Sequence, residues 1–144
     1  MKFSVLQENL HKGVSRASRI ISTKPQVPIL ANLLLLATEG GLQIISSSLE
    51  TTEKTTINAR VDKEGGICVP ARVFTELVAS LPQDTVLLEE KEKSLVVSCG
   101  GVKATIAGID SGEFPSVATT VGKSTTVVEK EVLVKALSLV LFAA

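Results

Sequence analysis

A unit of one strand, one helix and three strands occurs twice in the sequence, at about residues 1–62 and 66–110. In each copy a short apolar strand runs directly into an amphipathic helix, which lies within residues 7–24 in the first copy, ending before Lys24, and over residues 71–81 in the second. Repeats constrain a fold strongly, because equivalent units bury equivalent faces. We therefore predict an α+β domain with a pseudo-two-fold repeat of a β-α-β-β-β unit.

The other strands follow from apolar runs bounded by Gly-Gly turns. Residues 30–38 and 42–49 flank the first such turn, and residues 50–62 alternate like one half-exposed strand. The second copy supplies residues 85–90 and 94–99, followed after Gly100-Gly101 by an edge strand over 102–109. The side chains expected in the core are Leu10, Val14, Leu33, Leu35, Phe74, Leu77 and Val96.

The first helix has two faces that differ in kind. At helical spacing Leu6, Leu10, Val14, Ala17, Ile20 and Ile21 fall on one side. Lys12, Arg16 and Arg19 form a basic strip on the other side, and Lys24 follows just past the helix end, before Pro25. Such a strip is either a solvated surface or a surface that contacts phosphates without reading bases.

Composition narrows the classes of function. Fifteen basic and fifteen acidic residues cancel, which excludes a generally basic nucleic-acid binder, so a nucleic-acid role needs local segregation of charge. The 44% of hydrophobic residues is enough for a core. No signal-peptide pattern and no apolar run of membrane-spanning length occurs in the sequence.

No group of residues has the pattern of an active site, a metal site or a cofactor site. Glu89, Glu90 and Glu92 lie with lysines at a predicted hairpin tip, where a charged turn is the simpler interpretation. The single His11 has no cluster of cysteines to share a zinc ion. Cys68 and Cys99 stand in apolar strands, which predicts buried free thiols in a reducing cytosol.

A longer repeat relates the start of the chain to its end. Glu8, Leu10 and Lys12 match Glu131, Leu133 and Lys135 at a constant offset. This predicts a first domain over residues 1–117, a linker over 118–124 and the start of a second domain over 125–144. The chain would then be a fragment.

Four stretches of the sequence carry a resemblance to a known family. MKFSV opens the chain, PQVPILANLLL covers residues 25–35, VPARVF covers 69–74 and EFP covers 113–115. The sequence resembles the bacterial DNA polymerase III beta subunit, the replicative sliding clamp. The resemblance implies a DNA clamp fold and a cytoplasmic, non-catalytic processivity factor without cofactors. Three such domains make one subunit, and two subunits close head to tail around double-stranded DNA, with helices inside and sheets outside.

The resemblance also implies roles for individual residues. Lys24 and Arg72 match DNA-contacting positions of the family, and Lys12 matches a basic position of the first helix. Arg16 and Arg19 depend on the basic strip alone.

The edge strand, with Val102, Ala104 and Ile106, would meet the second clamp subunit. We expect Ile106 to face an uncovered edge. The polymerase and the clamp loader would bind through domains that this sequence does not contain.

Two other classes of function stay open at this point. One is a repeated α+β module for ligand sensing or protein interaction, in which the basic face is only solvated. The other is a hydrolase that uses Glu89 or Glu113.

Overall fold

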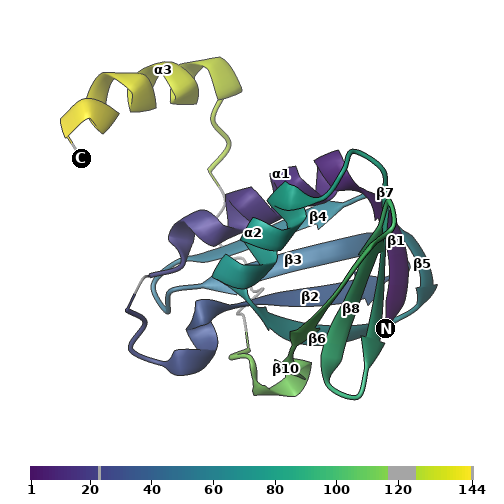
Figure 1. Ribbon diagram of the computed structural model, residues 1–144. Coiled ribbons are helices and arrows are strands. Elements are labelled where there is room, and N and C mark those ends of the chain that lie inside the picture. The colour runs from purple at the N-terminus through teal and green to yellow at the C-terminus, as the bar shows by residue number, and fades with distance from the viewer. Residues whose placement is uncertain (23, 117–125, 144) are drawn as a thin grey trace.

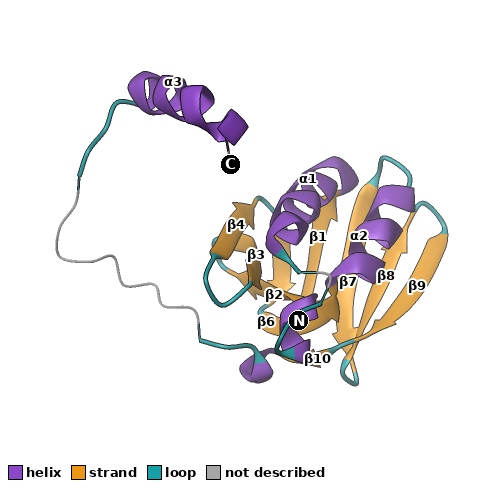
Figure 2. Ribbon diagram, turned by 90° about the vertical axis from the view of Figure 1, so that its left-hand side faces the viewer, coloured by secondary structure: helices purple, strands orange, loops and turns teal. Residues whose placement is uncertain are grey.

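The structure is a computed structural model that describes residues 1–22, 24–116 and 126–143. Residues 1–116 form two five-stranded sheets with two helices side by side across them (Figures 1 and 2). Every strand pairing is antiparallel. The predicted α+β repeat is confirmed, and its units are interlocked, because the strand that precedes each helix belongs to the other unit's sheet.

The first unit begins with β1 (Lys2–Leu6), which continues into α1 (Gln7–Ala17) and the short 3-10 helix η1 (Ser18–Ile20). A second 3-10 helix, η2 (Pro28–Ala31), leads into β2 (Asn32–Thr38), β3 (Gly41–Ser47), β4 (Thr52–Ile57) and β5 (Arg60–Lys63). The second unit has β6 (Gly65–Pro70), α2 (Ala71–Ser80), β7 (Thr85–Lys91), β8 (Ser94–Cys99), β9 (Val102–Ala107) and β10 (Ile109–Asp110). A 3-10 turn, η3 (Ser111–Glu113), follows.

The strand order shows how the units exchange strands. One sheet has the order β5-β1-β7-β8-β9, so β1 of the first unit pairs on one side with β7 of the second unit and on the other with β5 of its own. The other has the order β10-β6-β2-β3-β4, so β6 of the second unit pairs on one side with β2 of the first unit and on the other with β10 of its own. As predicted, β9 is an edge strand, and β4 is its counterpart in the other sheet.

Two predicted strands are in fact pairs of short strands that lie in different sheets. The predicted strand over 50–62 breaks at Asn58 and Ala59, where the chain passes from β4 to β5 in the other sheet. The predicted strand over 102–109 breaks at Gly108, after which β10 pairs with β6. A Cβ atom at Gly108 would lie 2.4 Å from Ile67 Cδ1, so a larger residue at this crossing would require the buried Ile67 side chain to move.

The first helix is shorter than predicted. α1 ends at Ala17, whose carbonyl accepts a 2.6 Å hydrogen bond from the buried hydroxyl of Ser46. Leu6 precedes the helix and is 57% exposed, so it does not belong to the apolar face.

The main core lies between the two sheets and the two helices. Leu10, Val14, Leu33, Leu35 and Phe74 are fully buried there, as predicted, and Leu77 packs against them half-buried. The prediction for Val96 is wrong. Along β8 the buried side chains are those of Leu95, Val97 and Cys99, and Val96 lies on the opposite face.

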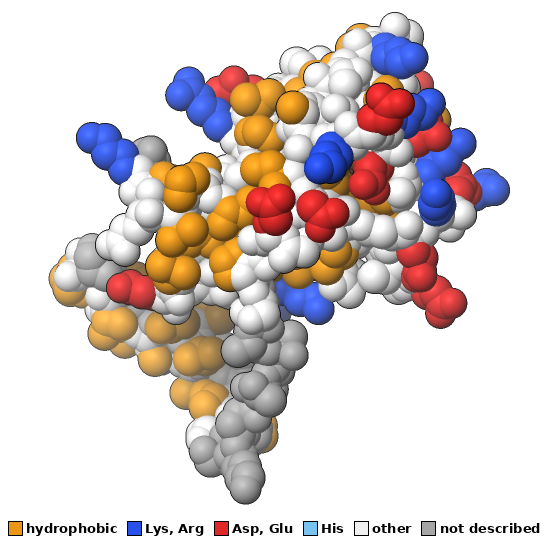
Figure 3. Space-filling model, turned by 90° about the horizontal axis from the view of Figure 1, so that it is seen from below, with side chains coloured by type: hydrophobic (Ala, Val, Ile, Leu, Met, Phe, Trp, Pro, Cys, Tyr) orange, Lys and Arg blue, Asp and Glu red, His pale blue; other side chains and the backbone are white. Residues whose placement is uncertain are grey.

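A smaller cluster covers the other face of the β2 sheet, which is why β2 is apolar on both faces. Its buried members are Leu30, Leu34, Ile45, Cys68 and Phe114. On this side of the molecule, where η2 and η3 lie in Figure 1, hydrophobic side chains gather between charged groups (Figure 3).

Beyond the domain, the structure describes one more helix, α3 (Lys130–Val140), with a short 3-10 turn, η4 (Leu141–Ala143). The described side chains of α3 are exposed, including Leu133 and Leu137. The predicted second domain over residues 125–144 therefore stays a prediction, and the predicted linker over 118–124 lies outside the described residues. No helix in the described ranges is long and apolar enough to span a membrane.

The packing of α2 gives a stability prediction. Phe74 is fully buried, whereas its neighbour Val73 is 52% exposed. Phe74→Ala should therefore lower the free energy of unfolding by about 3–5 kcal/mol, because it removes core contacts and leaves a cavity. Val73→Ala, the matched control, should change it by less than about 0.5 kcal/mol. Urea denaturation measures both, and equal effects would mean that the other face of α2 is packed.

Candidate nucleic-acid interface

The two helices are held together by side-chain hydrogen bonds. Gln7, at the start of α1, is buried and donates from Nε2 to the Val78 carbonyl of α2 at 2.8 Å. At the other end of α1, the hydroxyls of Ser18 and Thr75 lie 2.9 Å apart. These contacts fix the spacing between the outward faces of α1 and α2.

All five basic residues predicted to contact DNA are exposed on this helical side of the domain. Lys12 and Arg16 extend from α1, Arg19 from η1 and Arg72 from α2, while Lys24 lies on the loop that follows η1. The fold thus brings Arg72 onto the same layer as the basic strip of α1, from the other repeat unit. The helix layer therefore presents positive charge contributed by both units.

Three of these basic side chains form ion pairs with carboxylates of the chain. Lys12 pairs with Glu8 one turn earlier, and Arg72 Nε lies 3.0 Å from Glu76 Oε1 one turn later. Because Lys12 donates a hydrogen bond to the Glu8 carboxylate and is positively charged, the pKa of Glu8 is lowered. Both pairs are accessible to solvent.

The third ion pair joins Arg16 to Glu53 on β4, with 2.6 Å between Arg16 Nε and Glu53 Oε1. Glu53 is held in place because the hydroxyl of Thr55 also donates to its Oε1 atom. Sequence analysis missed Glu53, since it is remote from Arg16 in the chain. The alternation of β4, which turns Glu53, Thr55 and Ile57 to one face, was the available signal.

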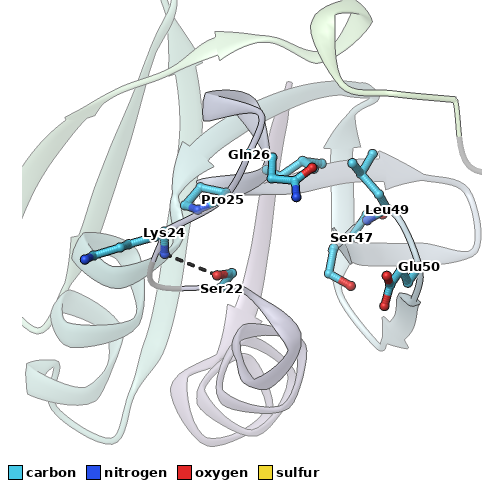
Figure 4. A pocket seen from close by; sticks show the side chains of 9 residues that line it. Ser22, Lys24, Pro25, Gln26, Ser47, Leu49 and Glu50 are labelled. Atoms are coloured by element: carbon cyan, nitrogen blue, oxygen red, sulfur yellow. Dashed lines mark hydrogen bonds between the residues drawn. The ribbon is translucent and has the colours of Figure 1, made fainter.

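Arg19 and Lys24 differ from the other three, since neither forms an ion pair within the described residues. The backbone N–H of Lys24 donates to the Ser22 hydroxyl at 3.2 Å. The Lys24 side chain extends away from the neighbouring hollow, which Ser47, Leu49 and Glu50 line on its far side (Figure 4). Glu50 makes this hollow a poor site for an anion.

The position of Arg72 is not explained by helix stability. It lies in the first turn of α2, where the helix dipole disfavours positive charge, and this turn contains no acidic residue. Its side chain is 90% exposed. A phosphate next to Arg72 would compensate for the unfavourable dipole interaction.

The predicted subunit interface is only partly exposed. Val102 is 45% exposed and Ala104 is half-buried, so both are accessible at the edge strand β9. The expectation that Ile106 faces an uncovered edge is wrong, because Ile106 is 7% exposed and packs in the main core. The alternation of β9 turns its side chain toward that core.

Of the two glutamates considered for hydrolysis, Glu89 forms a surface ion pair, whereas Glu113 is exposed in η3 and forms no ion pair within the described residues. Glu89 lies 3.0 Å from Lys91 Nζ, and that hydrogen bond lowers the Glu89 pKa, the opposite of what a general acid needs. Glu90 Oε2 lies 3.0 Å from the N-terminal ammonium. Within the described residues no group of three or more His, Cys, Asp or Glu side chains could hold a metal ion.

The chain is similar in structure to bacterial DNA polymerase III beta subunits and sliding clamps, and these define its structural class. A putative DNA polymerase III beta subunit from Eubacterium rectale superposes with a TM-score of 0.87 and 25% identity, covering 95% of this chain and 38% of that one. The sliding clamp of Bacillus subtilis superposes with a TM-score of 0.80 and 23% identity, covering 83% of this chain and 34% of its own.

The family follows from the sequence comparison. Residues 1–118 match the family described as DNA polymerase III beta subunit, N-terminal domain, so the chain belongs to this family, as the resemblance indicated. The beta sliding clamp of Micrococcus luteus is 34% identical over 116 residues, which are 81% of this chain and 37% of that protein. The beta sliding clamp of Synechococcus elongatus is 30% identical over 99% of this chain and 39% of its own length. The chain thus spans less than half the length of these relatives.

Neither cysteine of the domain has the setting of a nucleophile. Both thiols are free and buried, as predicted. Burial, followed by the nearby Asp110 and Glu113 carboxylates, raises the pKa of Cys68 to about 11, and burial also raises the pKa of Cys99.

These pKa shifts predict slow labelling of the folded chain. At about pH 8 both thiols are protonated and buried, so iodoacetamide should modify the native protein much more slowly than the urea-unfolded protein. The stability that Cys68 contributes is present below the ordinary thiol pKa of about 9 and is lost as the pH rises toward 11. Mass spectrometry of timed samples measures the labelling, and equal rates in the two states would contradict it.

Proposed function

We propose that residues 1–117 are the first domain of a DNA sliding clamp, a non-catalytic processivity factor that encircles duplex DNA and tethers a replicative polymerase. The family, the clamp fold and the names of the relatives support this function. One observation carries it for this chain: basic side chains from both repeat units project from the same helix layer.

In this proposal the helix layer faces the DNA and the sheets form the outer wall. Lys12, Arg16, Arg19, Lys24 and Arg72 contact phosphates without sequence preference. No side chain of this set needs to read bases, since enclosure by a ring retains the DNA and phosphate contacts carry no sequence information. Overall neutrality suits this role, because positive charge is needed on the inner face only.

The proposal also assigns the remaining parts of the chain. Residues 118–124 link the first domain to a second one, which starts at 125–144 and includes α3. The exposed apolar residues of α3, such as Leu133 and Leu137, would be covered by the rest of that domain. The edge strand β9, with Val102 and Ala104, would meet a second clamp subunit in the full-length protein. The polymerase and the clamp loader would bind other domains, in the cytoplasm.

The proposed DNA contact predicts a salt-dependent, sequence-independent affinity. Arg19→Ala with Lys24→Ala removes the two basic groups that form no ion pair within the described residues. The slope of log affinity against log salt should become shallower by up to about 1.8, which is about 0.9 per lost phosphate contact. Fluorescence anisotropy with two unrelated labelled duplexes measures it.

The control for this experiment replaces two exposed lysines on strands, Lys54 and Lys63, by alanine. It removes the same charge away from the helix layer and should leave the slope nearly unchanged. A preference for one duplex, or an equal loss with the control, would contradict a phosphate-contacting helix layer.

The assignment of β9 predicts the assembly state of this 144-residue chain. In the head-to-tail arrangement that the resemblance implies, the surface that pairs with β9 belongs to a different domain of the second subunit, and this chain spans 37% of the Micrococcus luteus relative. The chain should therefore be a monomer or form only weak dimers. Multi-angle light scattering at micromolar concentration measures the mass, and a stable closed ring would contradict this assignment.

A further inference from the structure

The basic residues of the helix layer fall into two groups. Lys12, Arg16 and Arg72 each pair with a carboxylate of the same chain, whereas Arg19 and Lys24 form no such pair within the described residues. The acidic partners come from three different elements: Glu8 from α1, Glu53 from β4 and Glu76 from α2. Each of the three elements thus places a carboxylate beside the proposed DNA-contacting surface.

These pairs contribute little to fold stability. The side chains of Lys12 and Glu8 are 70% and 68% exposed, and those of Arg72 and Glu76 are 90% and 67% exposed. Exposed ion pairs in solvent stabilise proteins weakly. Arg72 stands where the helix dipole opposes its charge, and pairing with Glu76 offsets only part of that effect. Stability therefore gives little reason for their placement.

In the Arg16–Glu53 pair, the carboxylate is more buried than in the other two pairs. The Glu53 side chain is 22% exposed, and the Thr55 hydroxyl fixes its carboxylate at 3.1 Å. The Arg16 side chain, by contrast, remains 70% exposed, and its Nε lies 2.6 Å from Glu53 Oε1. A phosphate can therefore reach the guanidinium from solvent without disturbing the buried part of the domain.

A carboxylate and a phosphate compete for the same donors. Lys and Arg nitrogens that hold a carboxylate must release it, or share it, before they can bind a phosphate oxygen in full. The displaced carboxylate then repels the phosphate through its like charge. Each pair should therefore weaken the contact between its basic residue and DNA.

We propose that Glu8, Glu53 and Glu76 are internal competitors of the DNA phosphates, which keep the contacts of Lys12, Arg16 and Arg72 weak enough for the domain to move along DNA. This inference rests on the proposed function and specifies the role of acidic residues at the same surface. Arg19 and Lys24 would then supply most of the residual attraction.

The test compares two triple variants of this chain with equal charge. The first is Glu8→Gln, Glu53→Gln and Glu76→Gln, which removes the three competitors. The second, the matched control, is Glu39→Gln, Glu92→Gln and Glu113→Gln, which changes three exposed glutamates that do not pair with the five basic residues. Both variants raise the net charge by the same amount, and thermal melts establish that each is folded.

The first variant should bind duplex DNA about eight-fold more tightly than the unchanged chain, because each of the three released basic residues should contribute about two-fold. Its log–log salt slope should be steeper by up to about 2.7, because up to three more phosphates are contacted. The control should change affinity and slope much less. Fluorescence anisotropy at several salt concentrations measures both.

The remaining outcomes separate this inference from the proposed function. An equal gain in both triple variants, or no gain in either, overturns the competition, while the proposed function stands if the Arg19→Ala, Lys24→Ala variant still loses affinity. If that alanine variant also leaves binding unchanged, the helix layer is not the DNA surface and the proposed function is overturned as well.

Discussion

The exchange of β1 and β6 between the two sheets is the constraint on which the rest of the domain depends. Each strand is hydrogen-bonded in one sheet and continues directly into a helix that packs across the core. Neither repeat unit can therefore complete its own sheet without the other. Each sheet has one of the short crossover strands, β5 or β10, at one edge and a longer strand, β9 or β4, at the other, so β4 and β9 occupy equivalent edges of the two sheets.

The exchange also brings α1 and α2 together, and buried polar contacts then set their relative position. Gln7 bonds to the Val78 carbonyl and Ser46 bonds to the Ala17 carbonyl, both with little access to water. Buried groups of this kind are costly to leave unpaired, so they favour one arrangement of the helices. The basic groups outside are positioned as a consequence of this packing.

The charge distribution of the helix layer depends on where the basic and acidic residues lie, and not on the net charge of the chain. Positive residues from both units share one side of the domain, while carboxylates on α1, α2 and β4 lie close enough to pair with three of them. A surface of this type attracts a polyanion in a salt-dependent way without holding any phosphate strongly. Under the proposed function, this balance would allow the domain to move along duplex DNA.

The sequence by itself determined the order of the elements, the faces of both helices and the family, because helix periodicity, Gly-Gly turns and the matching stretches are local signals. Only the tertiary structure decided which sheet each strand joins. The alternation of apolar and polar residues indicates which face of a strand is buried, but not which strand it pairs with. The tertiary structure also decided the register of β8, where the run from Leu95 to Val97 has no polar residue to distinguish its faces, and so placed Val96 outward. The ion pair between Glu53 and Arg16 also depends on the tertiary structure, because the fold places β4 next to α1. Neither segment's sequence alone predicts that contact.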